Sequence, residues 1–225
     1  MRRLVFAIGD IHGRRDLFEA ALRAIAGYGG DEHKTAVFLG DYVDRGPDSA
    51  GVVSRLMRLA GPGFVCLKGN HEAMMVEAIA TAPSRKLSSW LSNGGAETLD
   101  SYGGALGVPA EHLAWLDGLP LSWSDAHRDY VHAGVQPGLA LADQDDETLM
   151  WIRDRFLAAP PEALQRHIVH GHTPRWRGKP DPAAPELLPH RTNLDTGAWM
   201  TGVLSVGVFD EAVPGGPIEV LSIRG

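Results

Sequence analysis

The stretch GDYVDRGPDS, residues 40–49, places three aspartates and one arginine between two apolar segments. Gly, Pro, Asp and Ser are ordinary turn residues, so the stretch fits a solvated loop. It also follows an apolar run, TAVFLG (35–40), and precedes a helical pattern over residues 49–59. The end of such a strand is where α/β proteins place their ligands, so the carboxylates are equally suited to hold one.

The same arrangement occurs on both sides of this stretch. LVFAI (4–8) is followed by GDIHGR and an amphipathic segment over 16–26, and FVCLKG (64–69) is followed by NHE and a helix-like segment over 72–80. Strands that alternate with helices predict βαβ units and a mostly parallel sheet, and therefore an α/β fold. All three polar clusters lie at carboxyl ends of predicted strands, so we expect them to meet at one edge of the sheet.

The second half of the chain has a different pattern. Helical pieces around Trp90 and Trp115 predict a helical insertion over about 81–125, and these indoles suit either core packing, which we favour, or stacking on an adenine. Short strands are then expected at 129–134, 168–173, 193–197, 203–209 and 218–223. Because no segment has the composition of a linker, we expect residues 1–225 to form a single domain.

Composition excludes several classes of protein. The formal net charge of −7 disfavours a nucleic-acid partner, and a single cysteine, Cys66, excludes an intrachain disulfide framework. The apolar run after the two N-terminal arginines is too short for a signal peptide, and no stretch approaches the roughly 18 apolar residues of a membrane span. We therefore expect a cytoplasmic protein that binds neither nucleic acid nor membrane. The sequence assigns no oligomeric state.

Side chains that commonly ligate metals follow the predicted strand ends. They are Asp10, His12, Asp41, Asn70, His132 and His172. Carboxylate, amide and imidazole ligands without thiolate suit manganese, our first choice, or iron or zinc. Each residue alone is more often a turn or core residue, but several occur together beside glycines. We expect Asp41 to bridge two divalent ions, one completed by Asp10 and His12 and the other by the remaining three ligands, as is usual for phosphoester hydrolysis.

Five motifs carry a resemblance to a known family. GDIHG (9–13), GDYVDRG (40–46) and GNHE (69–72) resemble, in order and spacing, the leading motifs of the calcineurin-like metallophosphoesterases. VHAG (131–134) and HGHTP (170–174) resemble the two later histidine motifs of that family. Within it, the chain looks like a bacterial-type serine/threonine phosphoprotein phosphatase. The resemblance implies a sandwich of two mixed β-sheets flanked by helices.

The resemblance also implies roles for individual side chains. His71 would be the general acid that protonates the leaving alkoxide, and Asp44 would orient it. Arg45 would bind the substrate phosphate, for which the planar guanidinium is well suited. The pattern of tryptophan, any residue and arginine selects Arg153 as a second phosphate ligand, with Arg155 as the alternative.

The expected activity is hydrolysis of phosphoserine and phosphothreonine proteins, with phosphotyrosine proteins as a further class, by water that two metal ions activate. The partner is thus a phosphorylated protein or a small phosphoester. The alternative is a symmetrical dinucleoside tetraphosphate hydrolase, whose members usually carry aspartate where Glu72 stands. A catalytically dead scaffold is disfavoured because every expected ligand is present. Asp195 ends a predicted strand near this site, and we expect it to support a ligand.

Overall fold

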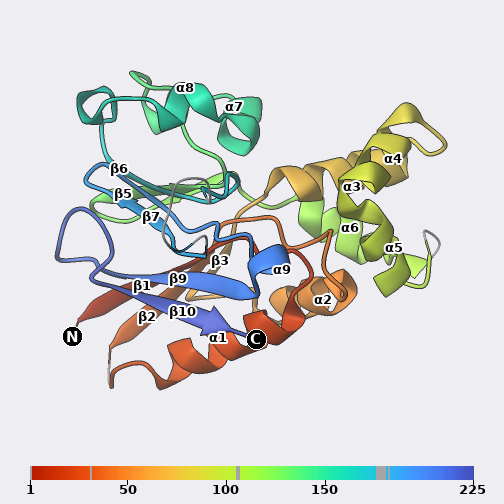
Figure 1. The fold of residues 1–225 in the computed structure, drawn as a ribbon, viewed down its shortest axis with the longest axis horizontal. Coiled ribbons are helices and arrows are strands. Elements are labelled where there is room, and N and C mark those ends of the chain that lie inside the picture. Colours follow the sequence, from red (N-terminus) through yellow and green to blue (C-terminus); the bar gives the residue numbers. More distant parts are fainter. Residues whose placement is uncertain (1, 31, 105–106, 176–180, 182) are drawn as a thin grey trace.

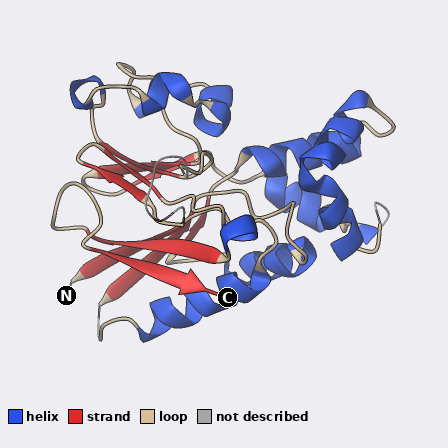
Figure 2. Cartoon of the chain, in the orientation of Figure 1, coloured by secondary structure: helices blue, strands red, loops and turns tan. Residues whose placement is uncertain are grey.

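The computed structural model describes residues 2–30, 32–104, 107–175, 181 and 183–225. Two five-stranded sheets pack against each other and helices cover their outer faces (Figures 1 and 2). The strands are β1 (Arg3–Ile8), β2 (His33–Phe38), β3 (Phe64–Cys66), β4 (Ser122–Ser124), β5 (Arg128–Val131), β6 (His167–His170), β7 (Glu186–Leu188), β8 (Arg191–Asn193), β9 (Val203–Asp210) and β10 (Glu219–Arg224). The predicted α/β fold with two mixed sheets flanked by helices is confirmed.

The helices connect these strands and cover the sheets. They are α1 (Arg15–Gly27), α2 (Ser49–Leu59), α3 (Asn70–Ala80), α4 (Arg85–Trp90), the π-turn η1 (Leu91–Gly95), α5 (Ala96–Ser101), α6 (Ala110–Asp117), η3 (Leu141–Asp143), α7 (Asp146–Trp151), α8 (Asp154–Leu157), η4 (Pro161–Ala163) and α9 (Ala198–Thr201). Within the described part of the chain, no helix combines the length and apolar character that crossing a bilayer requires.

The first sheet has the order β10-β9-β1-β2-β3. β1, β2 and β3 run parallel, whereas β9 is antiparallel to both β1 and β10. The β1 residues 4–8 are all buried, as expected for a central strand that is covered on both faces. Helix α1 lies below this sheet in Figure 1 and packs Phe18 edge-on against Phe38 of β2, with ring centroids 5.7 Å apart.

The second sheet has the order β4-β5-β6-β8-β7, in which β5, β6 and β8 are parallel and the edge strands are antiparallel. It faces the first sheet across a buried apolar layer, in which Tyr130 of β5 meets Phe209 of β9 at 5.9 Å between ring centroids. Its other face is covered by α7 and α8 (Figure 1). The carboxyl ends of the parallel strands of both sheets therefore point toward a common edge.

The helices α3 to α6 form a group beside the two sheets, on the right in Figure 1. The predicted helical insertion over 81–125 is wrong at its end, because Ser122–Ser124 form β4, which pairs with β5. Trp90 is fully buried in this group and Trp115 is partly buried against the core, in line with our preference for core packing.

The strand predicted over 193–197 is also wrong in its bounds, because β8 occupies only 191–193. After Leu194 the chain leaves the sheet through a turn in which Asp195 accepts a hydrogen bond from Gly197 N at 2.9 Å. Gly197 has φ +63°, a left-handed conformation that extended strands exclude. The turn leads into α9, a short helix that the sequence pattern did not predict.

Candidate active site

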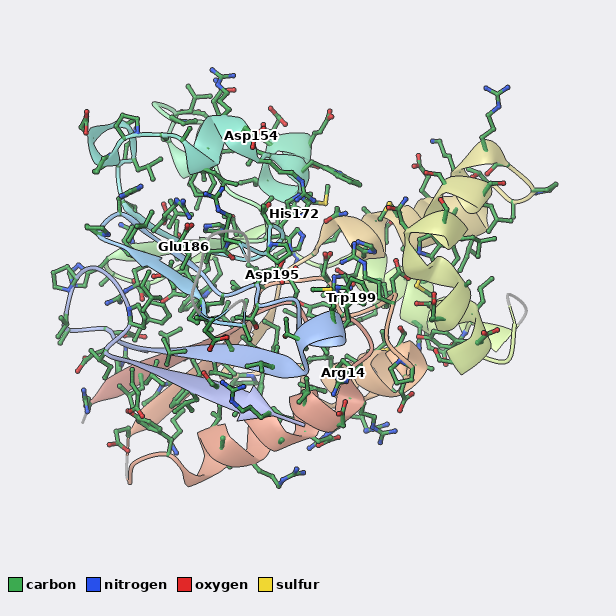
Figure 3. The ribbon with its side chains drawn as sticks, viewed as in Figure 1. Arg14, Asp154, His172, Glu186, Asp195 and Trp199 are labelled. Carbon is green, nitrogen blue, oxygen red and sulfur yellow. The ribbon has the colours of Figure 1, made fainter. Side chains whose placement is uncertain are left out.

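The six predicted metal ligands come together at the carboxyl edges of the two sheets. Asp10 follows β1, Asp41 follows β2, Asn70 begins α3, and His132 and His172 follow β5 and β6. None of the six, including His12, is more than 4% exposed. Figure 3 shows His172 and Asp195 near each other between the sheets, with Trp199 at the side of α9. The prediction that successive strand ends meet is therefore matched by the geometry.

The backbone at this edge is unusual because several non-glycine residues have positive φ. They are His12, Asp41, Asp44, Arg45 and His172. A left-handed conformation costs an ordinary residue about 1–2 kcal/mol, so it is uncommon outside sites where the surroundings impose it. Neighbouring glycines make the crowding possible. A Cβ atom on Gly171 would lie 2.0 Å from Asp10 Oδ1, and one on Gly69 would lie 2.3 Å from Asp41 Oδ1.

Two overlapping groups of side chains share Asp41. The first contains His12 and His71 and the second contains His132 and His172, with the ligand atoms of each group within 4.8 Å of one another. Asp41 Oδ2 lies 3.6 Å from His12 Nε2, and Asp41 Oδ1 lies 3.3 Å from His132 Nε2. One carboxylate thus faces both groups, as a bridging ligand would.

The donor atoms of these groups fit divalent cations. His132 donates from Nδ1 to Leu39 O at 2.8 Å, so its Nε2 carries a lone pair, which faces Asn70 Oδ1 at 2.9 Å. Two acceptors at this distance repel each other unless a cation lies near both. In addition, His172 Nε2 is buried without a hydrogen-bond partner in the described residues. A buried lone pair of this kind is costly unless it accepts a hydrogen bond or coordinates a metal.

Asp10 belongs to neither close group. Both of its carboxylate oxygens accept from the backbone N–H of His172, at 3.2 and 3.0 Å. Burial and the nearby carboxylates of Asp195 and Asp41 raise the pKa of Asp10 well above its usual value. This concentration of negative charge is the electrostatic environment that a divalent cation would relieve.

Asp195 and Asp41 respond differently to the same surroundings. Burial raises the pKa of Asp195 to about 6, and the charge of Asp41 contributes to the shift. Burial also disfavours the charged form of Asp41, but the imidazoles around it outweigh that effect and lower its pKa. Asp195 therefore lies close enough to interact with the predicted ligands, although the structure places no hydrogen bond between it and any of them.

His71 and Asp44 form a buried pair beside these groups. His71 donates from Nδ1 to Asp44 Oδ2 at 2.6 Å, and Asp44 is fully buried. Burial opposes protonation of His71, but the carboxylates of Asp41 and Asp44 outweigh it and raise the pKa of His71. His71 differs from His12 and His132 in the partner of its Nδ1–H group, which is a carboxylate, whereas theirs is a backbone carbonyl oxygen.

The helical group holds Asp44 in place, which the sequence pattern did not reveal. Trp90 donates from Nε1 to Asp44 Oδ2 at 2.9 Å, and Thr98 donates from Oγ1 to Asp44 Oδ1 at 2.7 Å. The same Thr98 oxygen accepts from Asp44 N at 2.8 Å. These residues lie about 50 positions further along the chain, so no local signal connects them to the aspartate.

Arg45 reaches over both groups from the same loop. Its Nη1 donates to His12 Nε2 at 2.6 Å, and its Nη2 donates to His71 Nε2 at 2.9 Å. Its guanidinium carbon also lies 5.5 Å from the ring centroid of Trp199 in α9. The guanidinium therefore occupies the entrance to the site, where it is available to an anion.

The two arginines after α7 have different surroundings. Arg153 donates to Thr173 Oγ1 at 3.2 Å, next to His172. Burial lowers the pKa of His172 to about 2, and the charge of Arg153 contributes to that shift. Arg155 instead bonds Gln136 Oε1 at 3.4 Å. The geometry therefore favours Arg153 over Arg155 as the second arginine of the site.

Glu72 has a structural role in the site. In the sequence, it served only to distinguish a protein phosphatase from a dinucleoside tetraphosphate hydrolase. Its carboxylate accepts hydrogen bonds from the backbone N–H groups of Gly69, Asp41 and Tyr42, at 2.9, 2.8 and 2.7 Å. It thereby fixes the loop after β2 to the start of α3. Burial raises the pKa of Glu72 to about 7.

Comparisons with known proteins agree with this geometry. Residues 4–199 match the family model described as "Calcineurin-like phosphoesterase". The chain is 28% identical to serine/threonine-protein phosphatase 2 of Escherichia coli, over 76% of this chain and 79% of that protein. It is 32% identical to a symmetrical bis(5'-nucleosyl)-tetraphosphatase of Acidovorax, over 81% of this chain and 59% of that protein. A crystal structure of a putative diadenosine tetraphosphatase superposes with a TM-score of 0.67 at 26% identity, covering 99% of this chain and 93% of the other.

Proposed function

This chain belongs to the calcineurin-like phosphoesterase family, and we propose that it is a phosphomonoesterase that acts on phosphoserine and phosphothreonine proteins, with phosphotyrosine proteins as a further class. Metal-dependent phosphoester hydrolysis is the activity of the family, and relatives of this chain are named as protein phosphatases and as dinucleoside tetraphosphatases. The choice between these two substrate classes is our inference from the site.

The observation that carries this choice is the buried pair of His71 and Asp44, 2.6 Å apart. A serine or threonine alkoxide is a poor leaving group, so its departure needs a proton donor. A nucleotide released from a polyphosphate leaves as a stable anion and gains little from such a donor. The raised pKa of His71 keeps a proton available, which supports a site adapted to alkoxide leaving groups.

The family depends on two metal ions, and we assign them to Asp10, His12, Asp41, Asn70, His132 and His172. Bound there, two divalent ions would activate the attacking water and neutralise charge on the phosphoryl group. Oxygen and imidazole ligands without thiolate suit manganese first, with iron and zinc as alternatives.

The other side chains bind the phosphate and move a proton. Arg45 and Arg153 bind phosphate oxygens, for which the guanidinium fork is well suited. In the structure, Arg45 Nη2 occupies the position next to His71 Nε2 from which a proton would be donated. When Arg45 turns to the phosphate, it releases that nitrogen, and its positive charge no longer disfavours the imidazolium. Phosphate binding thus prepares His71 to protonate the ester oxygen.

We also propose that residues 1–225 form one domain, in which the helical group serves the site. Its helices α5 and α6 contact α2 in the rest of the fold, and Trp90 and Thr98 hold Asp44. A helical unit that positions a catalytic pair is an integral part of the active site.

The second candidate is hydrolysis of symmetrical dinucleoside tetraphosphates. The similarity at 32% identity to a protein named for that activity favours it, as does the superposition on a putative diadenosine tetraphosphatase. In both candidates the metal ligands would be the same, so only the substrate distinguishes them.

The experiment that separates the candidates is turnover with Mn²⁺ of a phosphoserine peptide, a phosphotyrosine peptide and diadenosine tetraphosphate, side by side. We expect the peptides to give the higher kcat/KM, and we expect His71→Asn to abolish most of the phosphoserine activity while the metal content stays unchanged. Nucleoside diphosphate formed preferentially from the dinucleotide would overturn the proposed substrate class but leave the metal site intact.

A further inference from the structure

A pocket of about 380 Å³ opens directly beside the phosphate-binding arginine, and its lining includes Arg45, Leu91, Asn93, Glu97 and Trp199. Apart from Arg45 itself, its walls come from two segments that are far apart in the sequence, the helical group and α9. Because Arg45 holds the phosphate in the proposed reaction, this pocket is in position to receive the part of the substrate that continues beyond the phosphorylated residue.

The pocket wall is built against Arg45 itself. Arg45 N donates to Gly94 O at 2.9 Å, and a Cβ atom on Gly94 would lie only 2.6 Å from Arg45 Cγ. Gly94 also has φ +107°, which glycine adopts without strain. On the other side, the Trp199 ring lies against the Arg45 guanidinium. The position of the pocket relative to the bound phosphate is therefore fixed by backbone and ring contacts.

The charge of the pocket discriminates between substrate classes. Once Arg45 is paired with the phosphate, the remaining formal charge among the lining residues is the carboxylate of Glu97, which is exposed. Glu97 forms no ion pair with any other described residue, so its charge is available to a ligand. A carboxylate in this position repels the additional phosphates of a polyanionic dinucleotide and attracts a cation.

The opposite side of the site has the same sign of charge. A second pocket, of about 340 Å³, is lined by Trp151, Asp145, Glu147 and Arg155, so its lining carries two acids and one base. The Trp151 ring lies 6.2 Å from that of His172, which places this pocket next to the metal ligands. Both approaches to the site are therefore unfavourable for extended polyanions.

We propose that the pocket beside Arg45 binds the residue that flanks the phosphorylated residue of a peptide substrate, and that it selects a cationic side chain there. This inference rests on the proposed protein phosphatase function and specifies its substrates further. The methylene groups of a lysine or arginine pack on Trp199 and Leu91, while the charged end pairs with Glu97. Glu97 is thus a specificity residue.

The test uses two phosphoserine peptides that differ only by arginine or glutamate at the positions flanking the phosphoserine. Wild type should give the higher kcat/KM on the arginine peptide. Glu97→Gln should reduce the arginine-to-glutamate ratio of kcat/KM by about twofold to fivefold, the range for an exposed ion pair, and Glu97→Lys should reverse the preference. The matched control Glu162→Gln, an exposed glutamate on η4 outside this pocket, should keep the wild-type ratio.

The outcomes separate this inference from the function on which it rests. If both peptides are hydrolysed but Glu97→Gln and Glu97→Lys retain the wild-type ratio, the pocket assignment is refuted and the phosphatase function stands. If neither peptide is hydrolysed while diadenosine tetraphosphate is, the proposed function fails first and the inference fails with it. A ratio that shrinks in wild type as the salt concentration rises, but not in Glu97→Gln, supports the ion pair.

Discussion

Replacement of Asp44 by asparagine should reduce proton donation by His71 without disturbing the fold. An asparagine carbonyl at the Oδ2 position accepts from both His71 Nδ1 and Trp90 Nε1, which lie 2.6 and 2.9 Å away. Its NH₂ group then faces Thr98 Oγ1, which can accept because its own proton can turn to Ser49 Oγ, 3.0 Å away. Of the side-chain hydrogen bonds of Asp44, only the longer one from Trp90 Nε1 to Oδ1, at 3.0 Å, is lost, and the main change is the loss of the negative charge.

The size of the effect follows from the bond that changes. A hydrogen bond to a charged partner contributes about 1.5–3 kcal/mol and one between neutral partners about 0.5–1.5 kcal/mol, so the imidazolium of His71 loses roughly 1–1.5 kcal/mol of stabilisation. That is about one pKa unit, or about tenfold in the protonated fraction above the pKa. The acid form of His71 exists below its pKa, so the alkaline fall in activity should move to lower pH by about one unit.

The assay compares kcat on phosphoserine peptide with kcat on p-nitrophenyl phosphate across the alkaline pH range. We expect about a tenfold loss on the peptide and less than about threefold on the nitrophenyl ester, whose leaving group needs little protonation. Asp48→Asn makes the same chemical change at the N-cap of α2, where the Asp48 side chain accepts a hydrogen bond from Gly51 N. This control variant should leave both rates near wild type. Equal losses on the two substrates would refute the assignment of His71 as the acid.

Two further predictions concern the phosphate ligand and the metals. Arg153→Ala should lower kcat/KM about tenfold or more, since a charge-assisted hydrogen bond contributes about 1.5–3 kcal/mol. Arg155→Ala should change kcat/KM little. Steady-state kinetics that give the reverse order would assign the phosphate-binding role to Arg155. Removal of both metal ions with a chelator should lower Tm by about 10–20 °C, because each ion at 100 times its Kd contributes about 2.7 kcal/mol and because Asp10, Asp41 and Asp195 would be left close together. Calorimetry before and after Mn²⁺ is restored measures this change, and an unaltered Tm would argue against metal at the site.

The sequence predicted the part of the site that depends on strand ends. Hydrophobic runs located β1, β2 and β3 to within a few residues, and the residues that follow them meet because parallel strands share one edge. The helix over 49–59 was predicted with its observed bounds, since Asp48 gives a clear N-terminal signal and caps it. The local sequence pattern is sufficient for these elements, because each strand and the polar residues that follow it lie within one short stretch of sequence.

The contacts between distant segments were not predictable in the same way. Nothing near Trp90 or Thr98 indicates that they bond Asp44, and nothing near Trp199 indicates that it lies against Arg45. The short strands β4 and β7 were also missed, because three residues are too few to show an alternating pattern. These features depend on how distant segments pack in the folded chain, and no periodic pattern in a single sequence indicates such contacts.

The left-handed residues of the active site have a consequence for attempts to improve the protein in the laboratory. Arg45 has φ +70°, so glycine at this position would relieve about 1 kcal/mol of backbone strain. It would also remove the hydrogen bonds to His12 and His71 and the contact with the Trp199 ring. A selection for heat resistance alone responds only to these stability terms and takes no account of the proposed role of Arg45 in binding phosphate. Directed evolution of this fold needs a screen for turnover at every round, because its catalytic loop is retained for activity at the expense of stability.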